Sequence, residues 1–573
     1  MKRTIGRRII LTVAIFSIYL TSFIQASPKL SVIIIVDQFA YHYLPKLKNH
    51  LKGGIGYLMK NGINYQHARH AHGTPETAPG HNAFNTGVLP AVHGAVNNKW
   101  IIPKGDLIQY EFDSNVKETA VYKDEHTFDC CGMSPVHTDV EGFSDEFVRT
   151  SNLQEEHEVF SLTLKGVAGI ATAGKTGKAI WFDDATGLFT SSKYYYPENL
   201  PTWLNNFNHT AGITSLKTFP WKLAYKKNDP AYKFPFINDY SAATLKSITG
   251  TKLSIDHKKH HPFDLFIRTP AASEKLFELA EICLENNLPT DSNKKMVLWL
   301  CVSNLDLIGH LFGPDSKECI DTVYHTDQQL KKFMDAVNAR YGETNVLYAL
   351  SGDHGVQPLQ EVSRKKGIKT ARRILTEPLI KKMNAFIEKK YQIKNIVKTF
   401  IASYFVFDHP RFQSLSQEQQ TAIATDLRNM LQQIPGIKNA WTRSDLETGS
   451  FTFEQPEQFY KNHLRPDREI DLIVMPEEYS LVTPYKTGAS HDTPYDYDTH
   501  VPLIFYQKNM FHNKTIETPV WIPQVANTLS KIYGIQHPIQ SNLDVLPAFF
   551  DSEKPKVNIQ KKPHPSTPTS LKH

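Results

Sequence analysis

Leu30–Val36 reads LSVIIIV and is followed directly by Asp37. A continuous apolar run of this length is typical of a strand buried on both faces of a parallel sheet. Two further runs have the same form and lead into acidic and imidazole side chains: Met296–Val302 (MVLWLCV) before Asp306 and His310, and Asn345–Leu350 (NVLYAL) before Asp353 and His354. Because an open α/β sheet builds its site at the carboxyl ends of its strands, these polar residues are expected to lie together.

Between and after these strands, apolar residues recur with helical spacing in three stretches: Ala271–Asn287, His325–Tyr341 and Ser416–Gln433. Strands that alternate with helices predict an α/β protein with a mainly parallel central sheet covered on both faces. Residues 103–156 and 197–263 are rich in aromatic residues, Asn, Lys and Pro but have no clear periodicity. We interpret them as long insertions that cap the carboxyl edge of the sheet.

The N-terminus has the pattern of an export signal. Met1–Ala26 contains four basic and no acidic residues, and its apolar stretch Ile9–Ile24 precedes the small residue Ala26. This pattern predicts a signal peptide over 1–26, with an uncleaved membrane anchor as the alternative. The mature protein would be exported, to the periplasm if the source is a Gram-negative bacterium and otherwise to the medium or the cell surface. No later segment is apolar for long enough to span a bilayer.

The size and net charge of the chain limit the number of domains and the kinds of partner that it can have. At 573 residues, with 40% hydrophobic and 21% charged side chains, the chain can bury one large core or two smaller ones. The formal net charge of +6 falls to +2 when the four basic residues of Met1–Ala26 are left out, which argues against a nucleic-acid groove. We expect one folded domain over 27–550 and a disordered tail over 551–573. Cysteine pairing and oligomeric state stay open.

The polar residues at the strand ends are of the types that bind metal ions. Asp306 and His310 are four residues apart, so on a helix they share one face and can share a cation. Asp353 and His354 lie in a Gly-flanked turn directly after a buried strand. An unpaired carboxylate at such a depth would cost several kcal/mol, which favours a metal ligand.

A threonine that could act as a nucleophile lies along the chain between Asp37 and the pair Asp306 and His310. Thr77 stands in the turn-rich stretch 74–81 (TPETAPGH) and precedes a plausible helix. It is either a helix N-cap or a nucleophile that a metal or a base activates. His491, shortly before the apolar run His500–Tyr506, would alone be an ordinary polar histidine. The cluster His67, His70 and His72 is interpreted as surface or supporting groups rather than as another metal site.

Taken together, these residues resemble the alkaline phosphatase superfamily, in particular its branch of type I phosphodiesterases, nucleotide pyrophosphatases and threonine-nucleophile alkaline phosphatases. The resemblance covers about Leu30–Tyr506 and implies a three-layer α/β/α sandwich with cap insertions. It also implies two zinc ions per chain, one bound by Asp37, Thr77, Asp353 and His354 and the other by Asp306, His310 and His491. Thr77 would attack a small-molecule phosphate ester, and the phosphorylated threonine would then be hydrolysed.

The same resemblance implies two substrate-binding residues. Residues 93–100 (HGAVNNKW) resemble the stretch whose asparagine donates a hydrogen bond to a substrate oxygen, which falls on Asn98, with Asn97 as the alternative register. The phosphatases of this branch add a Ser-x-Lys-x-Arg segment that binds the extra charge of a monoester. Its best match is residues 163–167 (TLKGV), where Lys165 supplies the lysine but Val167 replaces the arginine. Lys165 is alternatively a solvated residue at a strand end.

We therefore expect an exported zinc-dependent phosphatase that acts on phosphate monoesters. Because Val167 lacks the bidentate guanidinium, a phosphodiesterase or nucleotide pyrophosphatase with the same two zinc ions is the alternative. A second alternative is a catalytically inactive, metal-stabilised binding protein, against which the presence of Thr77 argues. No readable motif gives the natural substrate.

Overall fold

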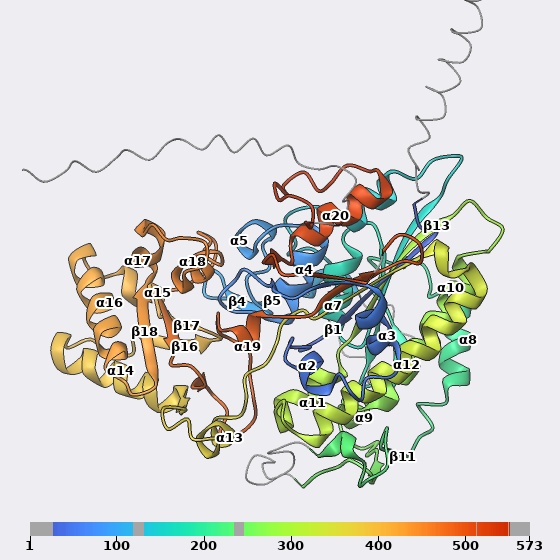
Figure 1. Cartoon of the computed structure of the whole chain (residues 1–573). Helices are drawn as coiled ribbons and strands as arrows, with labels where there is room; N and C mark the ends of the chain where they lie inside the picture. The colour runs from blue at the N-terminus through green and yellow to red at the C-terminus, as the bar shows by residue number, and fades with distance from the viewer. Residues whose placement is uncertain (1–26, 118–130, 234–245, 512, 548, 550–573) are drawn as a thin grey trace, which may run out of the picture.

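The parallel centre of the sheet is built from the apolar runs that the sequence marks. Figure 1 shows the computed structural model, which describes residues 27–117, 131–233, 246–511, 513–547 and 549. β1 (Leu30–Val36) pairs in parallel with β13 (Lys295–Val302) on one side and with β14 (Val346–Ser351) on the other. The predicted signal peptide at 1–26 and the predicted tail at 551–573 lie outside the described residues.

Within the described residues, the central sheet has nine strands in the order β10-β9-β8-β13-β1-β14-β21-β2-β22. β8 and β9 extend the parallel part, whereas β10 and β21 are antiparallel to their inner neighbours. The outer strands are β8 (His157–Thr163), β9 (Lys178–Asp183), β10 (Leu188–Thr190), β21 (Leu503–Tyr506), β2 (Ile63–Tyr65) and β22 (Lys514–Ile516). The large, mostly parallel sheet confirms the predicted α/β class.

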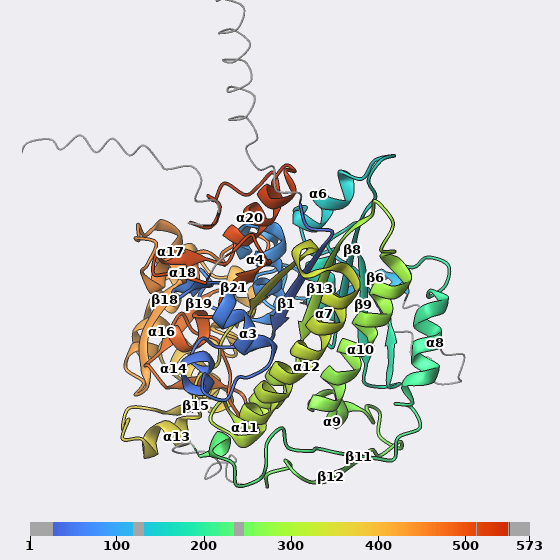
Figure 2. The same cartoon turned by 45° about the vertical axis from the view of Figure 1, so that its right-hand side comes forward.

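Helices cover both faces of this sheet, because alternate residues of β1 point to two different cores. Val32 and Ile34 belong to the cluster that also contains residues of α10 and α12, whereas Ile33 and Ile35 pack with residues of α4 and α20. Figure 2 shows α10 and α12 side by side over one face. The covering helices are α3 (Gly54–Asn61), α10 (Pro270–Asn287) and α12 (Lys317–Tyr341) on that face, and α4 (Thr77–Thr86), α6 (Phe143–Arg149) and α20 (Gln524–Tyr533) on the other.

The three stretches with helical spacing are helices. α10 matches its predicted bounds to within one residue, and α16 (Gln417–Gln432) follows a capping box formed by Ser416 and Gln419. α12 starts eight residues before the predicted stretch, because the Ser316 side chain accepts a hydrogen bond from Cys319 N and caps an earlier turn. The predicted strand at His500–Tyr506 is shorter, since β21 begins at Leu503, directly after Pro502.

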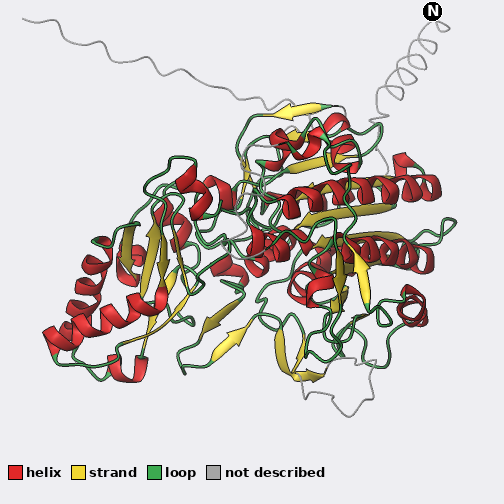
Figure 3. Cartoon of the chain, turned by 90° about the horizontal axis from the view of Figure 1, so that it is seen from below, coloured by secondary structure: helices red, strands yellow, loops and turns green. Residues whose placement is uncertain are grey.

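A second sheet, which the sequence analysis did not predict, lies between His354 and His491 along the chain. Its four strands run in the order β16-β17-β19-β18, and Figure 3 shows it apart from the main sheet. α14 and α16 pack on one face around Leu379, Leu427 and Val474. The unit consists of β15 (Arg373–Leu375), α14 (Thr376–Tyr391), β16 (Val397–Ile401), β17 (Tyr404–Phe407), α15 (His409–Gln413), β18 (Ile437–Thr442), α17 (Arg443–Thr448), α18 (Pro456–Lys461), β19 (Leu472–Pro476) and β20 (Leu481–Thr483).

The two aperiodic regions contain short elements. Residues 103–156 hold β5 (Leu107–Gln109), β6 (Phe112–Lys117), β7 (Cys131–Met133) and α6, and residues 197–263 hold α8 (Thr202–Ala211), β11 (Thr218–Pro220) and β12 (Lys252–Ser254). Trp221 anchors the second region, because its indole N–H donates to Asp321 Oδ2 of α12 at 2.7 Å. In the part of the chain that the structure describes, no helix is long and apolar enough to cross a membrane.

Four histidines are buried where the second sheet meets the main one: His70, His72, His93 and His463. The His72 ring lies 5.3 Å from those of both His70 and His463. His463 is held neutral by its partners, since Nδ1 donates to Val96 O and Nε2 accepts from Thr74 N. Burial lowers the pKa of His70 and of His463 to about 4 and that of His93 to about 3. Protonation of this cluster therefore opposes folding.

Lowering the pH from 7 to 5 should lower the free energy of unfolding. A histidine with a folded pKa of about 4 and an ordinary pKa of 6.5 takes up its proton in this range only after unfolding. The contribution of such a histidine to the free energy of unfolding is fully present above pH 6.5 and falls by about 2 kcal/mol by pH 5. Urea titrations at pH 7 and pH 5 measure this loss in the free energy of unfolding. The loss should be smaller by about 2 kcal/mol in His463→Gln than in the wild type. An equal difference in both proteins would contradict the burial of a neutral His463.

Candidate metal centre and nucleophile

Three acidic residues meet at the carboxyl ends of the three central strands. Asp37 follows β1, Asp306 lies in the first turn of α11 (Asn304–Phe312) after β13, and Asp353 follows β14. All three are at most 2% exposed. Burial raises the pKa of Asp37 to about 6, and burial together with the charge of Asp37 raises that of Asp353 to about 7. The site thus concentrates more negative charge than its surroundings neutralise.

The acidic and imidazole side chains form two adjacent groups. Within the described residues, ligand atoms lie within 4.8 Å of one another in Asp37, His81 and Asp353, and again in Asp306, His354 and His491. The structure also places His310 in the second group, because its Nε2 lies 3.1 Å from Asp306 Oδ1 and 3.2 Å from His491 Nε2. His354 contacts both groups, because its ring stacks on that of His491 with centroids 3.6 Å apart and its Nε2 lies 3.3 Å from Asp353 Oδ2.

All four imidazoles are oriented in the same way. The Nδ1 atom of each lies within 2.9 Å of a backbone carbonyl oxygen: Thr77 O for His81, Ala489 O for His310, Gly355 O for His354 and Pro75 O for His491. A carbonyl can only accept, so each Nδ1 carries a proton, and a ring that is neutral has its lone pair on Nε2. These Nε2 atoms lie 3.1–3.5 Å from carboxylate oxygens of the site. A cation between them would bind the lone pairs of neutral rings. Burial lowers the pKa of His491, but its hydrogen bond to Asp306 and the charges of Asp492 and Asp306 outweigh this effect and raise the pKa to about 10.

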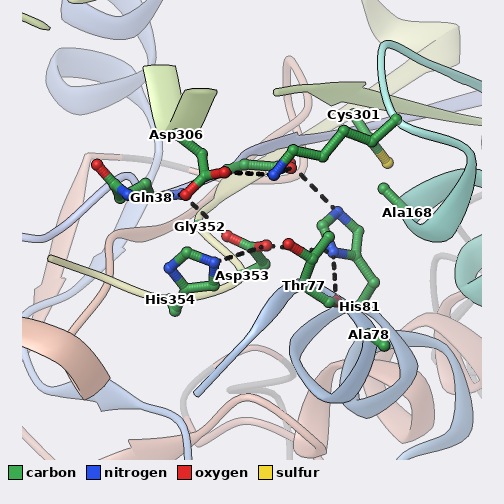
Figure 4. A network of polar contacts seen from close by, with 12 residues as sticks. Gln38, Thr77, Ala78, His81, Ala168, Cys301, Asp306, Gly352, Asp353 and His354 are labelled. Atoms are coloured by element: carbon green, nitrogen blue, oxygen red, sulfur yellow. Dashed lines mark hydrogen bonds and ion pairs between the residues drawn. The ribbon is translucent and has the colours of Figure 1, made fainter. Parts of the chain in front are cut away.

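Thr77 is the first residue of α4 and is 2% exposed. Figure 4 shows it beside Asp353, His354 and His81. His81 is one turn further along the same helix and bonds to the Thr77 carbonyl, while its ring faces Asp37 and Asp353. The sequence analysis did not assign His81 to the site. The four-residue spacing from Thr77 to His81 on one helical face would have indicated it.

Lys165 reaches into the site from the end of β8. It is the residue before α7 (Gly166–Ala173), and its ammonium forms an ion pair with Asp306 and lies 3.6 Å from Asp37 Oδ2. Burial disfavours its charge, but Asp306 and Asp37 outweigh this effect and raise its pKa. Lys165 is therefore a charged residue of the site and not a solvated strand end. Val167, where an arginine was expected, packs against an apolar cluster that contains Trp181.

The structure distinguishes between the two adjacent asparagines. Asn98 N donates to Glu76 Oε2 at 2.6 Å, and Asn98 Oδ1 accepts from Ala78 N, the amide after Thr77, at 2.8 Å. With its oxygen occupied in this way, the Asn98 amide presents its NH2 group for other acceptors. Asn97 is fully buried, and its Oδ1 accepts from the hydroxyl of Tyr404. Asn98 is thus the asparagine beside the nucleophile helix, and Glu76 holds its backbone.

Gln38 connects the two groups of ligands and was not predicted. Its backbone N–H donates to Asp353 Oδ1 at 3.0 Å, and its side-chain amide donates to Asp306 Oδ1 at 2.7 Å. It adopts φ +67°, a left-handed conformation that costs a residue other than glycine of order 1 kcal/mol or more. A Cβ atom at Gly309 would lie 1.8 Å from Gln38 Oε1, so a glycine in α11 makes room for this side chain.

Comparisons with known proteins show the family to which the chain belongs. Residues 31–501 match the family described as type I phosphodiesterase / nucleotide pyrophosphatase. Alkaline phosphatase PafA of Elizabethkingia meningoseptica is 25% identical over 518 residues, which cover 89% of this chain and 92% of that protein. Alkaline phosphatase PhoV of Synechococcus elongatus is 25% identical over 528 residues, with 90% and 91% covered.

Solved structures show the same fold. Wild-type PafA matches with a TM-score of 0.77 and 22% identity, covering 91% of this chain and 98% of that one. The family match extends from β1 to the residues just before β21 and includes every residue of the two ligand groups. The chain therefore belongs to the type I phosphodiesterase / nucleotide pyrophosphatase family, a family of phosphoric ester hydrolases.

Proposed function

We propose that the protein is an exported, zinc-dependent phosphatase that hydrolyses phosphate monoesters through a phosphorylated Thr77. The observation that carries this proposal is the common orientation of the four imidazoles, whose Nε2 atoms all face buried carboxylates close to Thr77. The alkaline phosphatase names of the relatives support the same reaction. Export rests on the residue pattern of Met1–Ala26.

The residues present fit two zinc ions. Several buried polar atoms have no hydrogen-bond partner among the described residues, namely both carboxylate oxygens of Asp37, Oδ2 of Asp353 and Nε2 of His81 and of His354. Carboxylates and imidazoles without thiolates suit zinc. Asp37, Asp353, His354 and Thr77 would hold one ion, with His81 close by, and Asp306, His310 and His491 would hold the other. Bound zinc would supply Lewis acidity that favours the Thr77 alkoxide and the departure of the leaving oxygen.

The chain's own residues would position the substrate. The Asn98 NH2 group, beside the first turn of α4, and the Lys165 ammonium, which contacts Asp306 and Asp37, would bind the non-bridging oxygens of the phosphoryl group. Thr77 would attack phosphorus in line with the leaving oxygen, and water would hydrolyse the resulting phosphothreonine. One solved relative is an alkaline phosphatase in which a threonine, an asparagine, a lysine and an arginine were replaced together. Thr77, Asn98 and Lys165 provide the first three residue types here.

A specific observation favours a second candidate, a phosphodiesterase or nucleotide pyrophosphatase with the same site. Val167 lies in an apolar cluster with Trp181, where a diester's second substituent would be accommodated better than a charged oxygen. Against it stands Lys165, whose ammonium is already directed at the site by Asp306. An inactive binding protein is the third candidate, and the burial of Thr77 beside the ligands argues against it.

Replacing the nucleophile should separate catalysis from metal binding. Thr77→Ala should keep its zinc, measured by elemental analysis after gel filtration, because six of the seven predicted ligands remain. The kcat for p-nitrophenyl phosphate should fall by at least about 10³-fold. Thr77→Ser, which keeps the hydroxyl, serves as the control and should retain part of the activity. A Thr77→Ala enzyme with near-normal kcat would remove Thr77 from the mechanism.

Val167→Arg should increase the preference for monoesters. A guanidinium that binds a phosphate oxygen contributes roughly 1.5–3 kcal/mol, or about 10- to 100-fold in the ratio of kcat/KM for p-nitrophenyl phosphate to that for bis-p-nitrophenyl phosphate. Val167→Met adds length without charge and should leave the ratio unchanged. Wild-type preference for the monoester would support the phosphatase, and preference for the diester would support the phosphodiesterase.

Removing the Gln38 side chain should weaken zinc binding. Gln38→Gly relieves the left-handed backbone and removes the hydrogen bond to Asp306, so the free energy of unfolding in the absence of metal should rise relative to Gln38→Ala. Both variants should lose zinc affinity by about 10- to 100-fold, as is usual when a group that orients a metal ligand is lost. Competition with a fluorescent zinc chelator measures this affinity. Unchanged zinc affinity in both variants would show that the Gln38 side chain does not orient Asp306 for metal binding.

A further inference from the structure

The residues on either side of Thr77 in the chain both bind Asn98. Glu76 Oε2 accepts a hydrogen bond from Asn98 N at 2.6 Å, and Ala78 N donates to Asn98 Oδ1 at 2.8 Å. The first contact orients the backbone of Asn98, and the second fixes which end of its side-chain amide faces α4. The Asn98 NH2 group and the Thr77 hydroxyl are therefore held in one common frame.

The backbone of Glu76 belongs to the start of the nucleophile helix. Its carbonyl accepts from Gly80 N at 2.9 Å, which ties it into the first turn of α4. Glu76 occupies the N-cap position, but its side chain makes no capping hydrogen bond to this helix. The carboxylate reaches the segment 22 residues further along the chain instead. The Glu76 side chain thus links the position of α4 to that of Asn98.

Asn98 has a second backbone contact, at its carbonyl, which accepts from Tyr110 N at 2.9 Å. This contact holds the segment in place beside the turn that follows β5. Among the described residues, Glu76 is the only acceptor for the Asn98 N–H. Loss of the Glu76 carboxylate would therefore leave the segment where it is and release the orientation of Asn98 alone.

We propose that Glu76 is a positioning residue for phosphoryl transfer, which acts by holding the Asn98 amide where a phosphoryl group bound at Thr77 needs its donor. A donor of this kind is effective when its geometry is fixed before the substrate binds. A displacement of about 1 Å can lower a rate by about 100-fold. This inference rests on the proposed phosphatase function, in which Asn98 binds a phosphoryl oxygen.

Two substitutions at Glu76 separate its hydrogen bond from its charge. Glu76→Gln and Glu76→Ala remove the same negative charge, but only Gln keeps an oxygen that can accept from Asn98 N. Matching the charge is necessary because Glu76 also lies near Asp492, the residue after His491: burial, together with the charge of Asp492, raises the pKa of Glu76. Both substitutions are tested in the wild type and in Asn98→Ala, and the zinc content of each protein is measured.

With Asn98 in place, kcat/KM for p-nitrophenyl phosphate should be lower in Glu76→Ala than in Glu76→Gln by about tenfold or more, at equal zinc content. With Asn98→Ala, the two Glu76 variants should agree within about twofold, because no amide is left to position. Glu454→Ala, at an exposed position of another segment, serves as the control and should resemble the wild type.

Three results would overturn the inference. The first is an equal kcat/KM of the two Glu76 variants when Asn98 is present. The second is the same tenfold difference between them in Asn98→Ala, which would mean that Glu76 does not act through Asn98. The third is a lower zinc content in Glu76→Ala than in Glu76→Gln, which would assign Glu76 to the metal ligands.

Binding of inorganic phosphate keeps the inference testable apart from turnover. Calorimetric titration of the zinc-loaded proteins should show weaker phosphate binding by Glu76→Ala than by Glu76→Gln, and this difference should vanish in Asn98→Ala. If the wild type fails to hydrolyse p-nitrophenyl phosphate, the proposed phosphatase function fails, whereas phosphate binding still decides the role of Glu76. Equal phosphate affinity of the two Glu76 variants would overturn that role.

Discussion

The repulsion among three buried carboxylates is the constraint on which the rest of the structure depends. Asp37, Asp306 and Asp353 come together because β13, β1 and β14 are parallel neighbours whose last residues pair in step, Val36 with Val302 and Ile35 with Ser351. The apolar strands hold this register, since a one-residue shift would turn every side chain of a strand to the opposite face of the sheet. The sheet thus supplies the stability that forces like charges into one place, where Lys165 offsets part of the repulsion and the proposed metal ions would offset the rest.

Much of the arrangement of the site residues could be predicted, because each strand and the polar residue that follows it lie within one short stretch of sequence. An apolar run followed by an acidic residue marks both the strand and the polar residue at its end, which placed Asp37 and Asp353 correctly at neighbouring strand ends. Gln38 and His81 escaped prediction for different reasons. The role of Gln38 depends on a left-handed backbone and on the space left by Gly309, and neither leaves a pattern in the sequence. His81 did leave a pattern in the sequence, because it follows Thr77 by four residues.

The second sheet escaped prediction because its strands are short and its elements lie far apart along the chain. Of its helices, the sequence analysis recognised only α16, although Leu379, Met383 and Ile387 of α14 also recur with helical spacing. Yet this unit positions the reaction centre, since His463 Nε2 accepts from Thr74 N and Tyr404 donates to Asn97. The segment before Thr77 and the segment that bears Asn98 are therefore both fixed by residues of a unit that contributes no ligand. Such supporting contacts are tertiary and cannot be recognised from residue types alone.

The insertion of this whole unit between His354 and His491 determines the order in which the site is assembled. A chain that emerges from the N-terminus, from a ribosome or through a translocation pore, presents Asp37, Thr77 and Asp353 long before His491. The group of Asp306, His310 and His491 is incomplete until the second sheet has emerged as well. A chain caught part-way through synthesis therefore holds only a partial set of the predicted ligands, and this set is complete only when the last third of the chain has folded.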